Sequence, residues 1–260
     1  MPDTTELIEI SWRRWDYIHC LAEEPRTRQE LMDELCYSYD TVYRRLKELQ
    51  ECHIVQRVDK KYKLTPLGKL ILNKFREIDE FGRIAEILST NPHYDDLDAK
   101  VLENANTIPV NGSYPTQPLN YITEKLMECN VVDGFTCTLL SRRAADMYHK
   151  AIVENGVNMN IITTRQVIEF LQSEHREKFN SAVKSGNLSV HITDENIPFT
   201  ALVFDKSELC LIVFNSNADT KGLMTMEGII SNCSTSSVNW ALERFKKLQE
   251  NSSLFNVGKV

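Results

Sequence analysis

Residues 26–64, RTRQELMDELCYSYDTVYRRLKELQECHIVQRVDKKYKL, contain the pattern that decides the fold of the N-terminal part of the chain. Thr27 and Glu30 form a capping box, in which the threonine side chain accepts from the Glu30 amide and the glutamate reaches back to the cap amide. Leu31 and Leu35 follow at the spacing of one helical face. This stretch therefore predicts a short amphipathic helix that begins just after Thr27.

A second helix is predicted after a tight turn at residues 37–39. Ser38 is a residue type that commonly caps the N-terminus of a helix. Val42, Leu46 and Leu49 recur at helical spacing, so we expect them to face a core. The opposite face of this helix is predicted to point outward, and it carries Tyr39, Asp40, Tyr43, Arg44 and Lys47.

Two short β-prone runs, residues 54–58 and 62–64, come next and are joined by residues 59–61. They predict a hairpin that has Lys60 and Lys61 at its tip. Helix, tight turn, helix and basic hairpin, in this order, predict a winged helix-turn-helix. In a helix-turn-helix the second helix lies in the major groove of DNA.

The charge of this segment differs from that of the whole chain. Residues 41–76 contain ten Lys and Arg against three Asp and Glu, a local charge of +7 (10 − 3), whereas the chain sums to −7. Lys and Arg neutralise phosphates and supply much of the affinity for DNA. Two functions stay open: a regulator that binds DNA, and an adaptor whose winged domain docks protein without DNA. We expect the regulator, with double-stranded DNA contacted by Thr27, Arg28, Ser38, Tyr39, Asp40, Thr41, Tyr43, Arg44, Arg45, Lys47, Lys60 and Lys61.

Motifs at both ends of the chain resemble one group of proteins. EPRTRQEL (24–31), YDTVYRRLKEL (39–49) and YKLTPLG (62–68) are similar to archaeal winged-helix transcription regulators. IPFTALVFD (197–205) and VNWALERF (238–245) resemble the tail of those whose C-terminal domain is of the methanogenesis-regulator type. That domain is distantly similar to the effector domain of TrmB-type sugar regulators. The resemblance implies a phospholipase-D-like fold for the C-terminal domain.

Length and composition indicate a globular protein with two domains. The chain has 260 residues, of which 42% are hydrophobic and 26% charged, and this is enough for two cores. No apolar run reaches the roughly 18–20 residues of a membrane span, and the N-terminus lacks a signal-peptide pattern. We therefore expect a cytoplasmic protein without membrane contact. Three of its seven cysteines, sixteen residues apart, are expected to pack in the core, with redox or metal sensing as the alternative: Cys20, Cys36 and Cys52.

Two further helices are predicted around the winged segment. Residues 7–22 predict a first helix, which ends before Pro25 because the residue before a proline avoids the helical conformation. Thr65 and Pro66 start a long helix at residues 66–88. Its apolar seam is longer than a small domain can cover, so we expect a homodimer interface; packing against the following domain is the alternative. The seam consists of Leu67, Leu70, Ile71, Phe75, Ile78, Phe81, Ile84, Ala85 and Leu88.

The domain plan has four parts: a winged helix-turn-helix (1–65), the connecting helix (66–88), a linker (89–118) and an α/β effector-sensing domain (119–260). Repeated Pro and Gly predict the linker. Its acidic residues and one histidine are explained by the start of a short helix at 97–105, so no metal is expected at His93, Asp95, Asp96 and Asp98.

The C-terminal part alternates strand and helix before it ends in a meander, which predicts an α/β domain with a mixed sheet. Helices are expected at 120–130, 142–154, 165–185 and 236–249, and strands at 131–140, 157–163, 188–193, 199–204, 209–214 and 223–230.

Two strand-to-helix junctions of this domain carry hydroxyl groups and arginines. Helix N-termini present free amides and attract anions, and ligands of open α/β sheets gather outside the carboxyl ends of strands. These junctions predict a site for a small anionic metabolite such as a sugar phosphate; ordinary helix caps with surface arginines are the alternative. The predicted site consists of Ser141, Arg142, Arg143, Thr163, Thr164 and Arg165.

Motifs for catalysis are missing from the sequence. A phospholipase-D active site needs His-x-Lys, and Lys never stands two places after any of the six histidines. There is also no Gly-x-Ser-x-Gly, no phosphate-binding Gly-rich loop and no His-Glu-x-x-His. We therefore expect no catalytic residues, no cofactor and no enzyme activity.

Overall fold

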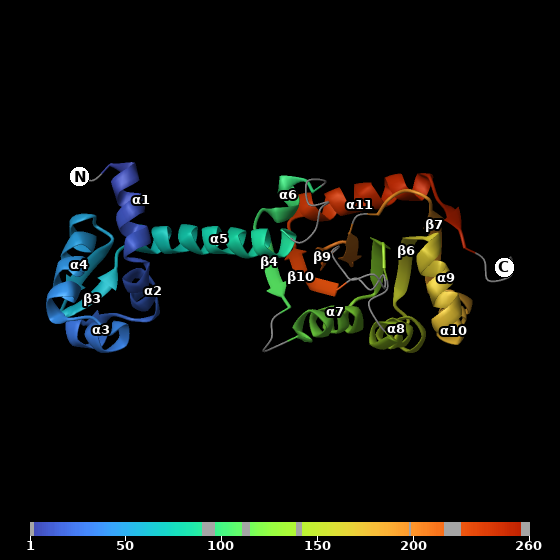
Figure 1. Cartoon of the computed structure of the whole chain (residues 1–260), viewed down its shortest axis with the longest axis horizontal. Coiled ribbons are helices and arrows are strands. Elements are labelled where there is room, and N and C mark those ends of the chain that lie inside the picture. Colours follow the sequence, from blue (N-terminus) through green and yellow to red (C-terminus); the bar gives the residue numbers. More distant parts are fainter. Residues whose placement is uncertain are drawn as a thin grey trace. The chain divides into compact units, whose positions relative to one another are not determined.

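The structure is a computed structural model that forms two compact units, Met1–Asp79 and Glu80–Val260 (Figure 1). The boundary between them falls within the long helix α5, Pro66–Leu88, whose bounds agree with the prediction. Among the described residues, no helix is long and apolar enough to cross a membrane. The structure describes residues 3–89, 97–110, 115–138, 142–197, 199–215 and 225–255.

The first unit begins with two helices, α1 (Thr4–Arg13) and α2 (Trp15–Glu23), where one helix was predicted. The helix is interrupted at Arg14, which has φ −119° and ψ 25°. The break allows α2 to bury Tyr17, Ile18 and Leu21 in the core of the unit. It also places the Arg14 guanidinium 2.7 Å from the Glu48 carboxylate. The prediction missed the break because the apolar spacing runs through it.

The helix-turn-helix is formed by α3 (Arg28–Leu35) and α4 (Tyr39–Glu51), which confirms the predicted fold. The capping box is present: the Glu30 amide donates to Thr27 Oγ1 at 3.3 Å, and the Thr27 amide donates to Glu30 Oε2 at 2.6 Å. Ser38 precedes α4, but its hydroxyl is paired with the Thr41 hydroxyl at 2.9 Å and not with a helix amide.

The wing is a three-stranded antiparallel sheet in the order β1-β3-β2, formed by β1 (Arg26–Thr27), β2 (Val55–Val58) and β3 (Lys61–Leu64). Asp59 and Lys60 join β2 to β3 with φ values of 47° and 67°, as a tight two-residue hairpin requires. β1 was not predicted, because two residues are too few to show an alternating pattern.

Parts of the predicted apolar seam of helix α5 are buried within the two units and are not available to a second copy of the chain. Phe75 is buried in the first unit, with its ring centroid 5.6 Å from Trp12 and 5.4 Å from Trp15. Ile84 and Leu88 belong to the core of the second unit. The outward part of the seam is therefore smaller than predicted. Besides the exposed Ala85 it contains Leu67, Leu70, Ile78 and Phe81, which are 36%, 56%, 50% and 52% exposed.

The second unit contains an eight-stranded mixed sheet in the order β11-β7-β6-β5-β8-β9-β10-β4, which confirms the predicted fold class. β5, β6 and β7 are parallel to one another, and the remaining pairs are antiparallel. The strands are β4 (Asn106–Pro109), β5 (Val131–Thr136), β6 (Asn158–Thr164), β7 (Leu188–Thr193), β8 (Thr200–Phe204), β9 (Glu208–Asn215), β10 (Thr225–Asn232) and β11 (Ser253–Leu254).

The interval 89–118, which was predicted as a linker with a short helix at 97–105, contributes two elements to the second unit. Helix α6 (Ala99–Leu102) lies within the predicted helix, whereas the edge strand β4 was not predicted. β4 pairs antiparallel with β10. The strand was not predicted because Pro109 was interpreted as a break in regular structure, although an edge strand tolerates proline at its end. Asp98 caps α6 by accepting from the Lys100 amide at 3.0 Å. Within the described ranges no group of His, Cys, Asp and Glu could hold a metal; His93, Asp95 and Asp96 lie outside those ranges.

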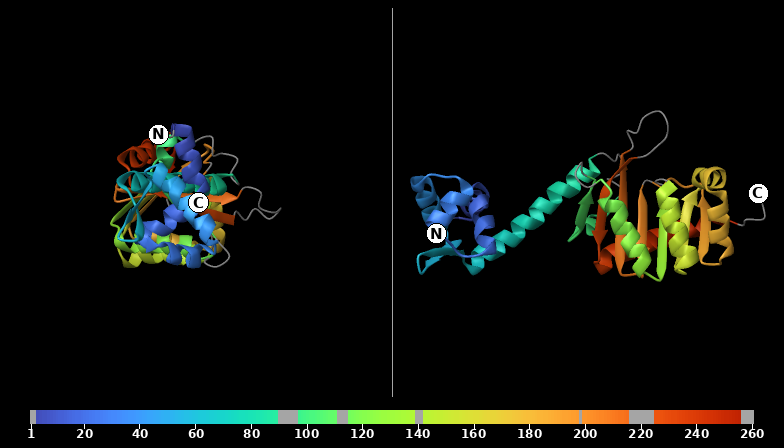
Figure 2. Two further views of the ribbon diagram at one scale, coloured as in Figure 1. Left: turned by 90° about the vertical axis from the view of Figure 1, so that its left-hand side faces the viewer. Right: turned by 90° about the horizontal axis from the view of Figure 1, so that it is seen from below.

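Helices cover both faces of the sheet (Figures 1 and 2). Successive strand residues face opposite sides, so Phe135 and Ile162 pack with α11 while Val132 and Met159 pack with α7 and α8. One face is covered by α7 (Gln117–Glu128), α8 (Arg142–His149), the π-helix Lys150–Glu154 that continues it, α9 (Arg165–Glu174) and α10 (Arg176–Lys184), and the other by α6, α11 (Thr235–Glu250) and the end of α5.

The cysteines of the first unit are placed differently from one another. Cys20 and Cys52 are buried in its core as predicted. The prediction is wrong for Cys36, which is exposed because it takes the left-handed position that ends α3. Burial raises the pKa of the Cys20 thiol to about 11, and it raises the pKa of the Cys52 thiol as well. A thiol with a raised pKa is a poor nucleophile. Cys20 and Cys52 therefore pack as small hydrophobic side chains.

Candidate nucleic-acid interface and ligand cavity

Helix α4 separates an apolar face from a polar one. Val42, Leu46 and Leu49 are at most 1% exposed and pack in the core of the first unit. On the other side Arg44 is exposed, and within the described residues no hydrogen bond or ion pair holds its guanidinium. Lys47 is exposed too and lies 3.7 Å from Glu51. The residues predicted to point outward are all exposed: Tyr39, Asp40, Tyr43, Arg44 and Lys47.

Arg28 connects α3, α4 and the wing at this surface. Its guanidinium hydrogen-bonds the Tyr39 hydroxyl and donates from Nη2 to Tyr62 Oη at 3.1 Å. The same group lies 4.8 Å and 5.0 Å from the ring centroids of Tyr39 and Tyr43. The hydrogen bond to Tyr62 raises the pKa of Arg28, so its charge is retained. Arg28 thus fixes two half-exposed aromatic rings beside the cations of α4.

Arg45, also predicted to contact DNA, lies elsewhere. Its guanidinium stacks on the Tyr37 ring at 4.1 Å, lies 5.8 Å from the Tyr17 ring and is 3.6 Å from the Asp16 carboxylate. The structure therefore does not bring Arg45 together with Arg44 and Lys47. Helical spacing could have predicted that Arg45 lies beside the apolar face, because it comes three residues after the buried Val42 and directly before Leu46.

The remaining predicted contacts lie at the edges of this surface. Thr27 and Ser38 stand at the N-termini of α3 and α4, and Ser38 is bonded to Thr41. Lys60 and Lys61 are exposed at the wing. Sequence reasoning missed Arg57, which is exposed on β2 with its guanidinium 5.8 Å from the Tyr62 ring. Alternation along β2 would not have identified it, because Arg57 is two residues after the buried Val55 and the burial of this strand does not alternate.

The two junctions predicted to bind an anion are only partly described. The carboxyl ends of β5 and β6 are adjacent, with Thr136 opposite Thr163 in a parallel register, although β5 ends earlier than predicted. Thr163 is buried and donates to the Thr136 carbonyl at 2.8 Å. Thr164 precedes α9 without a side-chain cap bond. Ser141 lies outside the described residues, Arg142 is the first residue of α8, and Arg143 and Arg165 are exposed.

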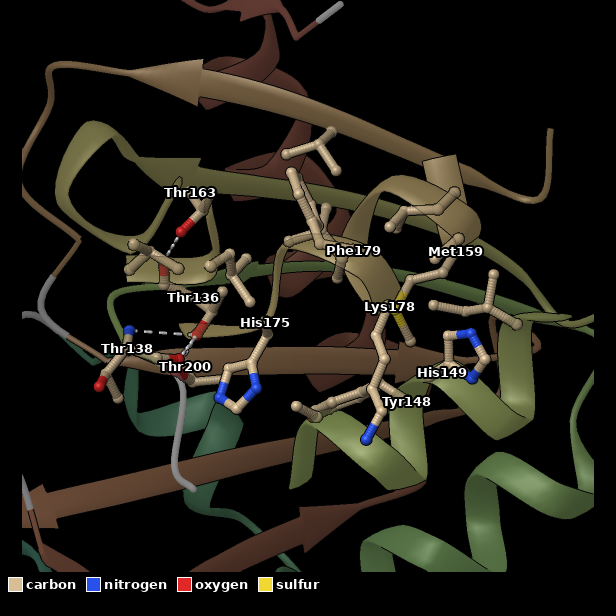
Figure 3. A pocket seen from close by; sticks show the side chains of 18 of the residues that line it. Thr136, Thr138, Tyr148, His149, Met159, Thr163, His175, Lys178, Phe179 and Thr200 are labelled. Carbon is tan, nitrogen blue, oxygen red and sulfur yellow. Dashed lines mark hydrogen bonds between the residues drawn. The ribbon is translucent and has the colours of Figure 1, made fainter. Parts of the chain in front are cut away.

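A cavity of about 110 Å³ lies between the sheet and the helices α8, α9 and α10 (Figure 3). Most of its wall is apolar, with residues from β5 to β9, the three helices and the π-helix. Among the described side chains of the predicted anion site, Thr163 alone lines it. The sequence shows no local sign of this cavity, because its apolar lining comes from separate segments and has the composition of an ordinary core. The apolar lining includes Ala145, Ile152, Met159, Ile161, Val167, Leu171, Phe179, Ala182, Leu188, Val190, Leu202, Ile212 and Phe214.

The polar groups of the cavity are few. Thr136, Thr138, Thr163 and Thr200 gather at one end, where hydrogen bonds link them (Figure 3). His149, His175, Lys178 and Tyr148 also line it. Lys178 forms an ion pair with Asp146. Burial raises the pKa of the Tyr148 phenol, so this group stays protonated.

Comparison with known proteins identifies the family. No curated protein sequence matches the chain. The family model described as the HVO_A0261 N-terminal domain matches residues 2–86. The model described as "Methanogenesis regulatory protein FilR1, middle domain" matches residues 115–251, more than half of the chain. The chain belongs to the FilR1 family. The resemblance to methanogenesis-type regulators is thereby confirmed for the part of this FilR1-family protein that contains the mixed sheet.

Several solved structures are similar to this FilR1-family protein. The archaeal chromatin protein TrmBL2, described with a novel mode of DNA binding, is 15% identical over 91% of each chain, with a TM-score of 0.42. NucT from Helicobacter pylori is 14% identical over 58% of this chain and 99% of its own, with a TM-score of 0.42. The phospholipase D family member Nuc from Salmonella typhimurium is 10% identical over 59% and 98%, with a TM-score of 0.43. The family assignment depends on the family model and not on these likenesses.

Proposed function

We propose that this FilR1-family regulator is a sequence-specific DNA-binding transcription regulator. The observation that carries the proposal is the outward face of α4, where the exposed Arg44 and Lys47 lie beside the tyrosines that Arg28 holds. In a helix-turn-helix this face enters the major groove, where an arginine can read guanine through two hydrogen bonds. Lys60 and Lys61 at the wing contact phosphate.

The regulator acts as a homodimer on a palindromic operator. An exposed apolar stripe on α5 is formed by Leu67, Leu70, Ile78 and Phe81. Trp12 of α1 is 63% exposed and stacks against Phe75 of α5. Exposed large apolar side chains along one helix mark an interaction surface. A two-fold pair of recognition helices doubles the contacts with DNA and matches a two-fold operator.

A small anion such as a sugar phosphate controls the regulator from the junctions before α8 and α9. Support comes from the adjacent carboxyl ends of β5 and β6, which lead toward these two helix N-termini. Ser141, Arg142, Arg143, Thr163, Thr164 and Arg165 are the proposed contacts. A thermal-shift screen of sugar phosphates and small carboxylates tests this role. Stabilisation should be present in the wild type and absent in Arg142→Ala/Arg165→Ala; equal stabilisation of both proteins would place the anion elsewhere.

The DNA-binding function is tested by selecting sequences from random DNA with the full chain and measuring their affinity in rising salt. We expect selected DNA to bind more tightly than random DNA, and affinity to fall steeply with salt because phosphate contacts release counterions. Arg44→Ala should remove the preference for the selected sequence. Failure to bind any DNA at low salt would instead favour the adaptor, which docks protein through the winged unit.

A further inference from the structure

The cavity beside α8, α9 and α10 is a candidate ligand site in the second unit. Apolar cavities are few in proteins because the atoms around an empty space lose packing contacts. Its wall includes Ile152 of the π-helix, and the same segment begins after His149, another lining residue. Short π-helical segments are frequent at functional sites. In other proteins, apolar cavities of this order of size hold a benzene-sized molecule.

The hydrogen bonds at the threonine end determine which ligand group fits there. Thr136 has one hydroxyl proton and donates it to the Thr138 carbonyl at 2.7 Å. Thr136 and Thr200 are 2.8 Å apart at their hydroxyl oxygens, so Thr200 is the donor of that bond. Thr163 donates to the Thr136 carbonyl. The protons of these three hydroxyls are therefore engaged. The Thr136 oxygen also accepts from the Thr138 amide at 3.3 Å, so the lone pairs left for a ligand are those of Thr163 and Thr200.

A carboxylate or phosphate only accepts hydrogen bonds, so Thr136, Thr163 and Thr200 give it no donor. The side chains on the wall that could donate to an anion are Thr138, His149 and His175, together with Lys178, which is already paired with Asp146; benzoate is the probe that tests them. A hydroxyl group can donate to the lone pairs of Thr200 and is matched to this end of the cavity. The phenol of Tyr148 also lines the cavity, and no hydrogen bond to it is found within the described residues. It can donate to the oxygen of the same or another ligand group.

We propose that the cavity binds a small neutral molecule with an apolar body of about one aromatic ring and one hydroxyl group that donates to Thr200. This site differs from the anion site of the proposed function and, where side chains are described, shares Thr163 alone with it. The proposal therefore does not depend on DNA binding or on the anion. Phenol serves as the probe, anisole as the analogue that lacks the donor, and benzoate as the anion on the same ring.

The test is calorimetric titration of the full chain with these three probes. We expect phenol to bind at least about tenfold more tightly than anisole, because anisole leaves the threonine acceptors unsatisfied. Benzoate should bind more weakly than phenol. Thr200→Val, which keeps the side-chain volume, should reduce the difference between phenol and anisole. Thr193→Val is the matched control, since Thr193 is a buried threonine on β7 outside the cavity.

A filled cavity gives a second, independent reading. Ala182 of α10 lines the cavity, and Ala182→Phe places a ring in it. This variant should lose phenol binding and keep its cooperative thermal unfolding; Arg165→Ala should leave phenol binding unchanged. If phenol binds Ala182→Phe or Thr200→Val as tightly as wild type, the proposed site is wrong. If benzoate binds most tightly, or if none of the three probes binds, the ligand class is wrong.

Discussion

The two units differ in where their candidate binding groups lie: on the outer surface of the first unit, and in a cavity of the second. In the first unit Arg44, Lys47 and the wing lysines lie on the surface, and the rings of Tyr39 and Tyr43 are half exposed beside them. In the second unit four threonines line a cavity whose wall is mainly apolar. The difference matches the partners that are proposed for the two units. A DNA duplex can be reached only by an outward surface, whereas a small apolar molecule gains most when it is removed from water.

The largest effect should come from separating two copies of the chain. Ile78→Glu with Phe81→Glu adds charge to exposed positions of α5, so each unit should still fold. If both recognition helices bind one operator, affinity should fall at least about a hundredfold, since linked sites gain that much from binding together. Light scattering and DNA titration measure the two effects. A variant that remains a dimer would move the interface away from α5. Phe75 is not a suitable target, because it packs against Trp12 and Trp15.

The next effect should be confined to the outward surface. Arg44→Ala is expected to weaken binding to the selected DNA by about 1–3 kcal/mol if the arginine reads a guanine. Thermal stability should stay the same because Arg44 is exposed. Arg45→Ala is the informative comparison. It removes the stack on Tyr37 and should lower thermal stability more than it lowers affinity for DNA. The reverse result for the two arginines would mean that α4 presents a different face.

An inward polar group should instead affect stability. The Lys125 amine lies 2.6 Å from the Glu208 carboxylate, and their side chains are 32% and 9% exposed. Lys125→Met leaves that carboxylate without its cation, which should cost about 1–2 kcal/mol, less than at a fully buried ion pair. Chemical denaturation measures the loss. Lys178→Met, at a more exposed ion pair, is the matched control and should cost less.

The same pair predicts a dependence on pH. Burial raises the pKa of Glu208, but hydrogen bonds from Lys125, Tyr121 and Ser231 outweigh burial and bring it below its ordinary value of 4.5. A lowered pKa contributes stability that is present above 4.5 and is lost as the pH falls through the folded-state pKa. Lys125→Met should therefore lose less stability on acidification than wild type. An unchanged acid response would show that Lys125 does not set this pKa.

The smallest effect should come from the wing. Lys60→Ala with Lys61→Ala should lower affinity several-fold for selected and random DNA alike, because phosphate contacts carry no sequence information. The slope of log affinity against log salt should decrease by roughly 0.9 for each lost phosphate contact. Titrations at several salt concentrations measure both quantities. A selective loss for the selected DNA would show that the wing enters a groove.

Local patterns predicted most of the first unit and the element order of the second. The capping box at Thr27 and Glu30 and the bounds of α5 follow from residues that are neighbours in the chain. The mixed sheet was predicted because strands and helices alternate before a meander. β1, β4 and β11 were missed, since short edge strands show too little alternation and gain their stability from the strand beside them.

The sequence by itself determined the winged fold, the polar face of α4 and the basic wing, because capping, helical spacing and local charge act between residues close in the chain. Only the tertiary structure decided that Tyr37 is the ring on which Arg45 stacks, that Phe75 is buried by Trp12, and that four threonines meet at one cavity. These outcomes depend on contacts between distant segments. Thr136 and Thr200, 64 positions apart, become neighbours through sheet pairing, which no local pattern encodes.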